Sequence, residues 1–258
     1  MRQLISISVC VGVLTLVTSA VQAIDHSNLD ENRPLRIEDA YPISVGEFAL
    51  EAGVGYTMER HGTDRAFFPM EVLYGAYPGL QLSLGSTLLT DPREIDGPHK
   101  SGDLRLSSLY NFNQETLSQP AFGLRGSLNV PTGVRSAGVD FELKGLVTKS
   151  FNRWSLHFNP AYEFLSGGGR DERDGRYSFT LGTSYPIGAP KYTRTTLVAD
   201  VFTEQSSRKG EANVWGAEAG FRHQMTQRLV LDFGVGSEFA GPAKRSTFFV
   251  TTGISFSF

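Results

Sequence analysis

Cysteine is nearly absent from this chain: its 258 residues include one, Cys10. A disulfide within the chain is therefore excluded, because it needs two thiols. Cys10 also lies in an N-terminal segment that we expect to be removed, which would leave no thiol in the mature protein. This absence fits an exported protein that needs no disulfide.

Long apolar runs are missing after residue 23, where no window holds 18 uncharged apolar residues. A helical membrane protein is excluded, because a spanning helix needs roughly 20 such residues. Helical periodicity is also poor. Charge of one sign is not concentrated either, since the formal net charge is −3 and the chain has no basic patch and no charged tail. No nucleic-acid partner is therefore expected.

The first 23 residues predict a cleaved signal peptide. Arg2 supplies a positive start, residues 4–17 are mostly apolar, and Val21-Gln22-Ala23 has the small-x-small form of a cleavage site. The apolar run is too short for a membrane anchor. Val9, which precedes Cys10, is not the small residue that a lipoprotein signal needs.

What the sequence does contain is alternation of apolar and polar residues with a period of two, in segments of roughly ten residues between turn residues. In the last segment, the even-numbered residues from Phe248 to Phe258 form one face and the odd-numbered residues form the other. The same pattern predicts strands at 46–58, 66–76, 80–89, 102–112, 121–131, 139–149, 153–164, 177–186, 193–205, 211–223, 229–240 and 247–258.

This even number of strands suits a bacterial barrel with both ends in the periplasm. In hydrocarbon every backbone polar group must be paired within the protein, so the sheet must close and the last strand must pair with the first. A soluble β-sandwich would also alternate, but it would not usually combine a signal peptide with polar residues on the inner face of almost every strand. The predicted fold is all-β: a closed antiparallel transmembrane β-barrel of about 12 strands in the bacterial outer membrane.

Residues 24–45 do not alternate. We expect them to form a periplasmic segment or a partial plug that precedes the barrel at 46–258. Aromatic residues gather near strand ends, as interfacial girdles would. Phe256 and Phe258, at the end of the last strand, are the expected signal for the barrel-assembly machinery.

The inward face of the strands is where function is expected to lie. Two readings of its charges stay open: a network of ion pairs that props the lumen, or a polar path whose charges tune what passes. The candidate lumen-lining residues are Glu47, Glu51, Glu71, Asp103, Arg105, Arg125, Asp140, Glu142, Lys144, His157, Glu163, Asp200, Glu204, Glu218, Arg222, Asp232 and Glu238.

Catalytic patterns are lacking. An outer-membrane lipase would need a Ser/His pair with an orienting polar residue at the lipid face. No Gly-x-Ser-x-Gly elbow is present, and His157 is expected to be a hydrogen-bonded lumen histidine. No His, Asp and Glu cluster has metal-ligand spacing, so no catalytic residue, metal or cofactor is expected.

Residues 33–42, Arg-Pro-Leu-Arg-Ile-Glu-Asp-Ala-Tyr-Pro, and residues 46–51, Gly-Glu-Phe-Ala-Leu-Glu, resemble the opening of the outer-membrane family called "putative MetA-pathway of phenol degradation". Ile37 stands where that family usually has Thr. The mid-chain stretch 128–133, Leu-Asn-Val-Pro-Thr-Gly, also resembles it. The matching positions Pro34, Glu38, Asp39, Gly46, Glu51, Pro131 and Gly133 are expected structural anchors, and the resemblance provides no catalytic residues.

The resemblance implies a porin-like channel for the uptake of hydrophobic or aromatic compounds. Our leading expectation is a passive outer-membrane channel for small solutes, in contact with outer-membrane lipid and lipopolysaccharide. The alternatives are a surface-interaction barrel with a closed lumen and, as a minor class, a lipid-modifying enzyme. We also expect Glu38 and Asp39 to pair with lumen arginines such as Arg105 or Arg125, which would tuck residues 24–45 into the periplasmic mouth.

Overall fold

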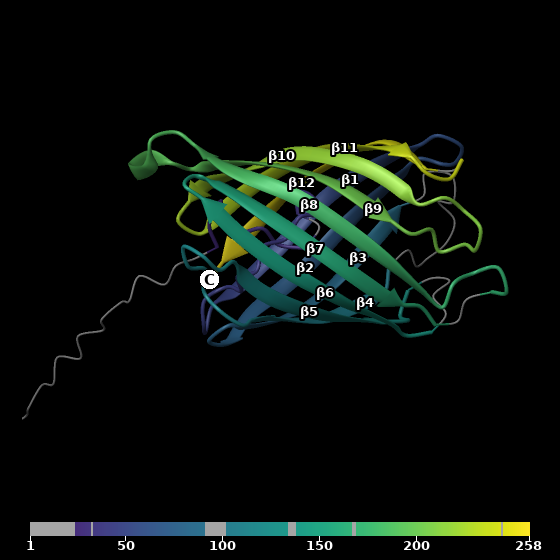
Figure 1. Ribbon diagram of the computed structural model, residues 1–258, viewed down its shortest axis with the longest axis horizontal. Coiled ribbons are helices and arrows are strands. Elements are labelled where there is room, and N and C mark those ends of the chain that lie inside the picture. Colours follow the sequence, from purple (N-terminus) through teal and green to yellow (C-terminus); the bar gives the residue numbers. More distant parts are fainter. Residues whose placement is uncertain (1–23, 32, 91–101, 134–137, 167–168, 244) are drawn as a thin grey trace, which may run out of the picture.

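The described residues of this computed structural model, which are 24–31, 33–90, 102–133, 138–166, 169–243 and 245–258, form twelve antiparallel strands in one closed barrel (Figure 1). The predicted fold class is confirmed. The expected signal peptide at 1–23 and most of the expected outer loop at 90–101 lie outside the described residues.

Every predicted strand overlaps one observed strand, with small shifts at the ends. The strands are β1 (Phe48–Glu59), β2 (Arg65–Tyr77), β3 (Leu80–Thr90), β4 (Leu104–Asn111), β5 (Ala121–Val130), β6 (Asp140–Phe151), β7 (Trp154–Phe164), β8 (Gly175–Ile187), β9 (Thr195–Glu204), β10 (Val214–Thr226), β11 (Leu229–Ala240) and β12 (Ser246–Ser257). A short 3-10 turn, η1 (Pro190–Tyr192), connects β8 to β9. Among the described residues, no helix is long and apolar enough to cross a bilayer.

The barrel closes where β1 meets β12, as the sequence predicts. Their ladder runs from Ala49 opposite Ser257 to Glu59 opposite Ser246. The backbone N–H of Phe258 donates to the carbonyl of Phe48 at 2.9 Å. This pairing removes both free edges of the sheet, which hydrocarbon would not tolerate.

The pleat of each strand separates a lipid face from a lumen face. On β1, Leu50 and Val54 are exposed on the outside, while Glu51 between them is completely buried on the inside. On β12, Phe256 is exposed and its neighbour Ser255 is buried. An apolar exterior around a polar interior is the pattern of an outer-membrane barrel.

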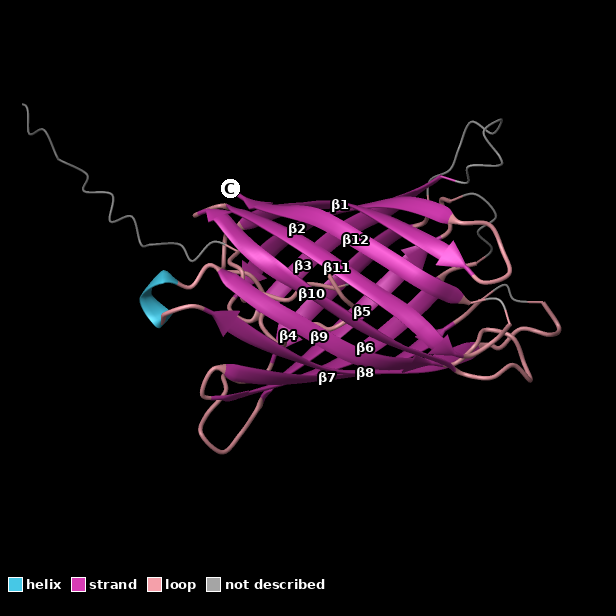
Figure 2. Cartoon of the chain, turned by 90° about the horizontal axis from the view of Figure 1, so that it is seen from above, coloured by secondary structure: helices cyan, strands magenta, loops and turns pink. Residues whose placement is uncertain are grey.

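The connections differ between the two ends of the barrel. The end where β1 begins and β12 finishes, here called the inner end, carries η1 and tight turns such as the one between β6 and β7, where Asn152 adopts a left-handed φ of 60°. The inner end also carries the longer connection 112–120 between β4 and β5, and other longer connections lie at the opposite, outer end (Figure 2). Exposed aromatic side chains mark the inner end, among them Tyr77, Phe112 and Trp154.

Residues 24–45, here called the lumen loop, lie inside the barrel (Figure 1). Both ends of this loop are at the inner end: the N–H of Ile24 donates to Glu47 Oε1 at 3.1 Å, and Gly46 leads directly into β1. Apart from residue 32, which is not described, the stretch from Leu29 to Ala40 is buried except for the half-buried Arg36. The loop therefore enters and leaves the lumen on the same side and occupies its middle.

Candidate solute pathway and the charged lumen

Side chains of the barrel wall hold the backbone of the lumen loop. Strand side chains accept hydrogen bonds of 2.8–3.1 Å from four backbone N–H groups of the loop. The pairs are Ile37 with Asp200, Glu38 with Asn159, Ala40 with Thr148, and Ile43 with Gln81. A buried irregular segment must have its backbone polar groups satisfied, and here inward polar residues of the strands do so.

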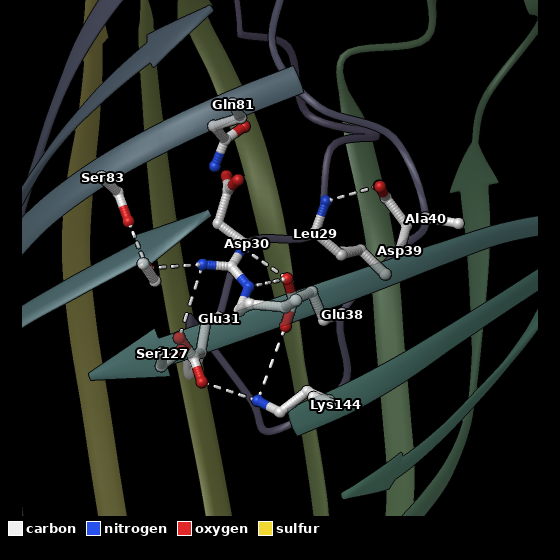
Figure 3. A network of polar contacts seen from close by, with 12 residues as sticks. Leu29, Asp30, Glu31, Glu38, Asp39, Ala40, Gln81, Ser83, Ser127 and Lys144 are labelled. Atoms are coloured by element: carbon white, nitrogen blue, oxygen red, sulfur yellow. Dashed lines mark hydrogen bonds and ion pairs between the residues drawn. The ribbon is translucent and has the colours of Figure 1, made fainter. Parts of the chain in front are cut away.

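The acidic side chains of the loop meet a basic wall formed by Arg105, Arg125 and Lys144 on the neighbouring strands β4, β5 and β6. Glu31 Oε1 lies 2.6 Å from both Arg105 Nη2 and Lys144 Nζ. Glu38 Oε1 accepts from Arg125 Nε at 2.6 Å. In Figure 3, the carboxylates of Glu31 and Glu38 both point toward Lys144.

The basic side chains of the loop meet acidic groups on the other side of the barrel. Arg33 donates to Asp232 Oδ2 of β11 at 3.0 Å and to the carbonyl of Ile254 at 2.8 Å. Arg36 lies 3.1 Å from Glu204 of β9 and 3.2 Å from Glu218 of β10. The loop thus carries, toward each side, the charge opposite to that of the wall.

Most of the side chains in these ion pairs are buried, which determines their protonation and the cost of removing one of them. The side chain of Glu31 is 4% exposed. Burial alone would raise the pKa of Glu31, but Lys144, Arg105 and Arg125 outweigh it and hold the pKa well below its usual range. Glu31 therefore stays ionised, and its removal would leave buried cations with too few counter-charges.

The lumen loop lies between an outer and an inner cavity. The outer cavity, about 450 Å³, is lined by Arg33 to Arg36 of the loop together with Phe67, Pro69 and Phe249. The inner cavity, about 550 Å³, is lined by Asp39 and Tyr41 of the loop and by wall residues near the inner end. A smaller cavity of about 180 Å³, beside Arg36 and Arg176, adjoins the outer mouth.

The predicted lumen residues lie on the inner face, and many meet as pairs. Arg105 contacts Glu142 at 3.0 Å, and Arg176 contacts Glu163 at 2.5 Å. Arg222 lies 3.4 Å from Asp30. The outermost of them bind backbone groups of the loops: Asp103 accepts from Gly133, Asp140 from Ser166, and Glu238 from Ser246. Glu71 lines the outer cavity.

The predicted pairing with a wall arginine is confirmed for Glu38 and wrong for Asp39. Glu38 pairs with Arg125, but Asp39 pairs with neither Arg125 nor Arg105. Its carboxylate instead accepts from the N–H groups of Leu29 at 2.8 Å and Tyr41 at 2.8 Å, both within the lumen loop. The prediction for Asp39 was wrong because short-range backbone donors reach its short side chain before any wall arginine does.

Four further charged residues of the lumen loop pair with the wall, in addition to Glu38. Asp30, Glu31, Arg33 and Arg36 make the ion pairs described above, and none was a candidate. In the sequence, these four residues are marked by one shared feature: charged residues of both signs occur in a segment without apolar and polar alternation. Of the expected anchors, Pro34 accepts a 2.7 Å hydrogen bond from Thr251 Oγ1 through its carbonyl. The rings of Phe256 and Phe258, the expected assembly signal, stack with their centroids 6.2 Å apart on the outside of β12.

His157 is buried between two hydroxyl groups. Its Nδ1 lies 3.1 Å from Thr148 Oγ1 and its Nε2 lies 3.1 Å from Ser184 Oγ. These side chains line the inner cavity and face the lumen, whereas a lipase would present such a group to lipid. In the described part of the chain, no group of three His, Cys, Asp or Glu side chains is placed to hold a metal ion.

Comparison with known families agrees with the resemblance noted in the sequence. The model of the family described as "Putative MetA-pathway of phenol degradation" matches residues 33–258. The chain belongs to this family. Among curated proteins, no sequence matches significantly.

Solved structures share the fold at low sequence identity. An outer membrane channel from Pseudomonas putida F1 aligns with a TM-score of 0.66 and 14% identity, over 90% of this chain and 100% of that chain. The NanC porin aligns with a TM-score of 0.62 and 12% identity, over 80% and 98%. The KdgM porin aligns with a TM-score of 0.55 and 11% identity, over 81% and 99%. The chain therefore shares the closed β-barrel fold of these outer-membrane proteins.

Proposed function

We propose that the protein is a passive outer-membrane channel for small solutes, hydrophobic or aromatic ones among them. The observation that carries this proposal is the lumen itself: it is charged and polar, and it holds an outer and an inner cavity on opposite sides of the lumen loop. A barrel that served only as a surface scaffold would not need cavities on both sides of the lumen loop. The family description and the porin fold support the same function.

The lumen loop is the closing element in this proposal. It is attached to the barrel through Gly46 and is otherwise held without covalent bonds, by hydrogen bonds, by ion pairs and by apolar packing such as that of Leu35 and Ile37 against Val198. It can therefore move without breaking the strand ladder. The outer cavity combines the apolar side chains of Phe67, Pro69 and Phe249 with the charged side chains of Arg33 and Arg36, which suits solutes that have both an apolar body and a polar group.

No bond chemistry is part of the proposal. The apolar belt would contact outer-membrane lipid and lipopolysaccharide, and the barrel-assembly machinery would insert the chain through its last strand. The Ser184–His157 contact is inside the lumen, where it has no access to a membrane ester.

Planar-bilayer recording tests the channel. We expect small currents from the full barrel and several-fold larger, steadier currents from a variant that lacks residues 24–45. Absence of current from both proteins, with the barrel shown to be folded by its strand content, would refute the channel and favour a closed surface barrel. Equal currents from both would refute the role of the lumen loop.

A further inference from the structure

Arg36 sits in a cradle formed by groups of three adjacent strands. Its Nη1 lies 3.1 Å from Glu204, its Nε lies 3.2 Å from Glu218, and its guanidinium carbon lies 4.0 Å above the ring of Phe202. Glu238 completes the cradle at 4.0 Å. We call Phe202, Glu204, Glu218 and Glu238 the cation cradle. An aromatic face with converging carboxylates is a general arrangement for binding delocalised organic cations.

A buried acceptor without a hydrogen-bond donor lies next to the cradle. Asp200, next to it on β9, is 4% exposed, and its Oδ1 has no hydrogen-bond partner among the described residues. Its other oxygen accepts from the N–H of Ile37 at 3.1 Å. A buried acceptor without a donor is costly, so the surroundings of the cradle favour groups that donate hydrogen bonds.

The cradle is also open to the pathway. Arg36 and Glu218 line the outer cavity, while Arg36, Phe202 and Glu204 line the smaller cavity beside it. The side chain of Arg36 is 34% exposed, whereas that of Arg33, which is bound by Asp232 and a backbone carbonyl, is 7% exposed. Arg33 is therefore enclosed by the wall, and Arg36 occupies a position that a solute can reach from outside.

We propose that the cation cradle is a recognition site for solutes with a guanidinium-like or amidinium-like group, and that Arg36 fills it as an internal stand-in when no solute is bound. This inference deepens the proposed function and rests on it, because it names the charge class of the solute. Leu35, Pro69 and Phe249, which line the adjoining outer cavity, would contact the flat apolar body of such a solute. The entering cation and Arg36 then compete for the same carboxylates.

Benzamidine is a suitable probe, because it joins an amidinium to a flat apolar ring, and benzamide is its neutral control of the same shape. Binding is measured by calorimetry on the purified barrel in detergent. We expect the Arg36→Ala barrel to bind benzamidine at least about tenfold more tightly than the unmodified barrel, and neither barrel to bind benzamide. If the alanine variant does not fold, Arg36→Gln keeps a side chain over Phe202 and still removes the internal cation.

A matched pair of second substitutions locates the site. On the Arg36→Ala background, Glu218→Gln should abolish benzamidine binding. Glu71→Gln should preserve it, because Glu71 also lines the outer cavity but lies on β2, away from the cradle. Equal benzamidine affinity with and without Arg36, equal losses from both glutamine variants, or equal binding of benzamide would each overturn the proposal.

Bilayer recording of the same proteins separates this proposal from the channel. Benzamidine binding without any ion current would refute the channel and leave the cradle established. Ion current without benzamidine binding would do the reverse.

Discussion

Replacing Glu31 with Gln should open the channel more than any other conservative change in the lumen loop. Glu31 contacts Arg105 and Lys144 at 2.6 Å each and Arg125 at 3.5 Å. Glutamine keeps the size of the side chain and removes its charge. Whenever the loop is docked, the basic wall would then hold its three cations with one carboxylate fewer, against Glu38, Glu142 and the more distant Glu71. In the undocked state water would solvate these cations.

The size of the effect follows from burial. Removing one partner of a buried ion pair costs about 3–5 kcal/mol. We expect the lower end, about 3 kcal/mol, because Glu38 and Glu142 remain near the same cations. Since each 1.4 kcal/mol is a factor of ten, the ratio of undocked to docked loop should rise on the order of a hundredfold.

Single-channel recording measures this ratio as the time spent in the high-conductance state. Limited proteolysis from the inner side reports the same equilibrium, because an undocked loop exposes its backbone. Glu163→Gln is the matched control: Glu163 pairs with Arg176 of β8, which is part of the wall and not of the loop. That variant should change the ratio by less than about fivefold, as for a partly exposed pair.

A Glu31→Gln barrel that folds normally, with unchanged open time and proteolysis rate, would refute a role of Glu31 in holding the loop. Equal effects of Glu31→Gln and Glu163→Gln would also refute it, because total lumen charge and not loop docking would then control the current.

Three further predictions concern the loop and the inner cavity. Burial raises the pKa of Asp39 to about 7, so the docked loop favours the protonated carboxyl. Docking should be strongest below about pH 4 and weaken as pH rises through 7, and Asp39→Asn should remove this dependence of open time on pH. Gly182→Ala should increase open time, because the added Cβ would lie 2.4 Å from Cδ1 of Ile37 and 2.8 Å from a backbone oxygen of the wall, while Ile37→Ala in the same barrel should relieve the first clash. Purified barrel should show no ester hydrolysis that depends on Ser184 or His157, as measured with a soluble nitrophenyl ester; a loss of activity in both alanine variants would contradict a passive channel.

The strands could be predicted from the sequence because a barrel wall has one local rule. Every strand separates lipid from lumen, so apolar and polar residues must alternate, and each ten-residue window shows this without knowledge of its neighbours. Closure followed from the cost of a free edge in hydrocarbon. That β1 pairs with β12 therefore needed no information beyond the first and last segments, whereas the register of the two strands came from the structure.

The lumen loop obeys no such local rule. Its contacts join residues far apart in the chain, as when Arg33 reaches Asp232 and Arg36 reaches Glu218. Which wall residue meets which loop residue depends on the tilt and register of all the strands together, and a single sequence does not contain these. Asp39 is the opposite case, because its partners are near it in the sequence. They are the N–H groups of Leu29 and Tyr41, whereas arginines of the wall were predicted from the sequence.

The distribution of charged residues on the barrel wall nevertheless explains why the lumen loop carries charges of both signs. Arg105, Arg125 and Lys144 lie together on β4 to β6, and acidic side chains such as Glu218 lie together on β9 to β11. A side chain of one sign could not satisfy both walls. A segment that crosses such a lumen must carry acids toward one wall and bases toward the other, and Glu31 with Arg36 meets that requirement. Displacing the loop would leave the two walls facing each other across water, so the same residues that close the channel also determine the field that a passing solute would meet.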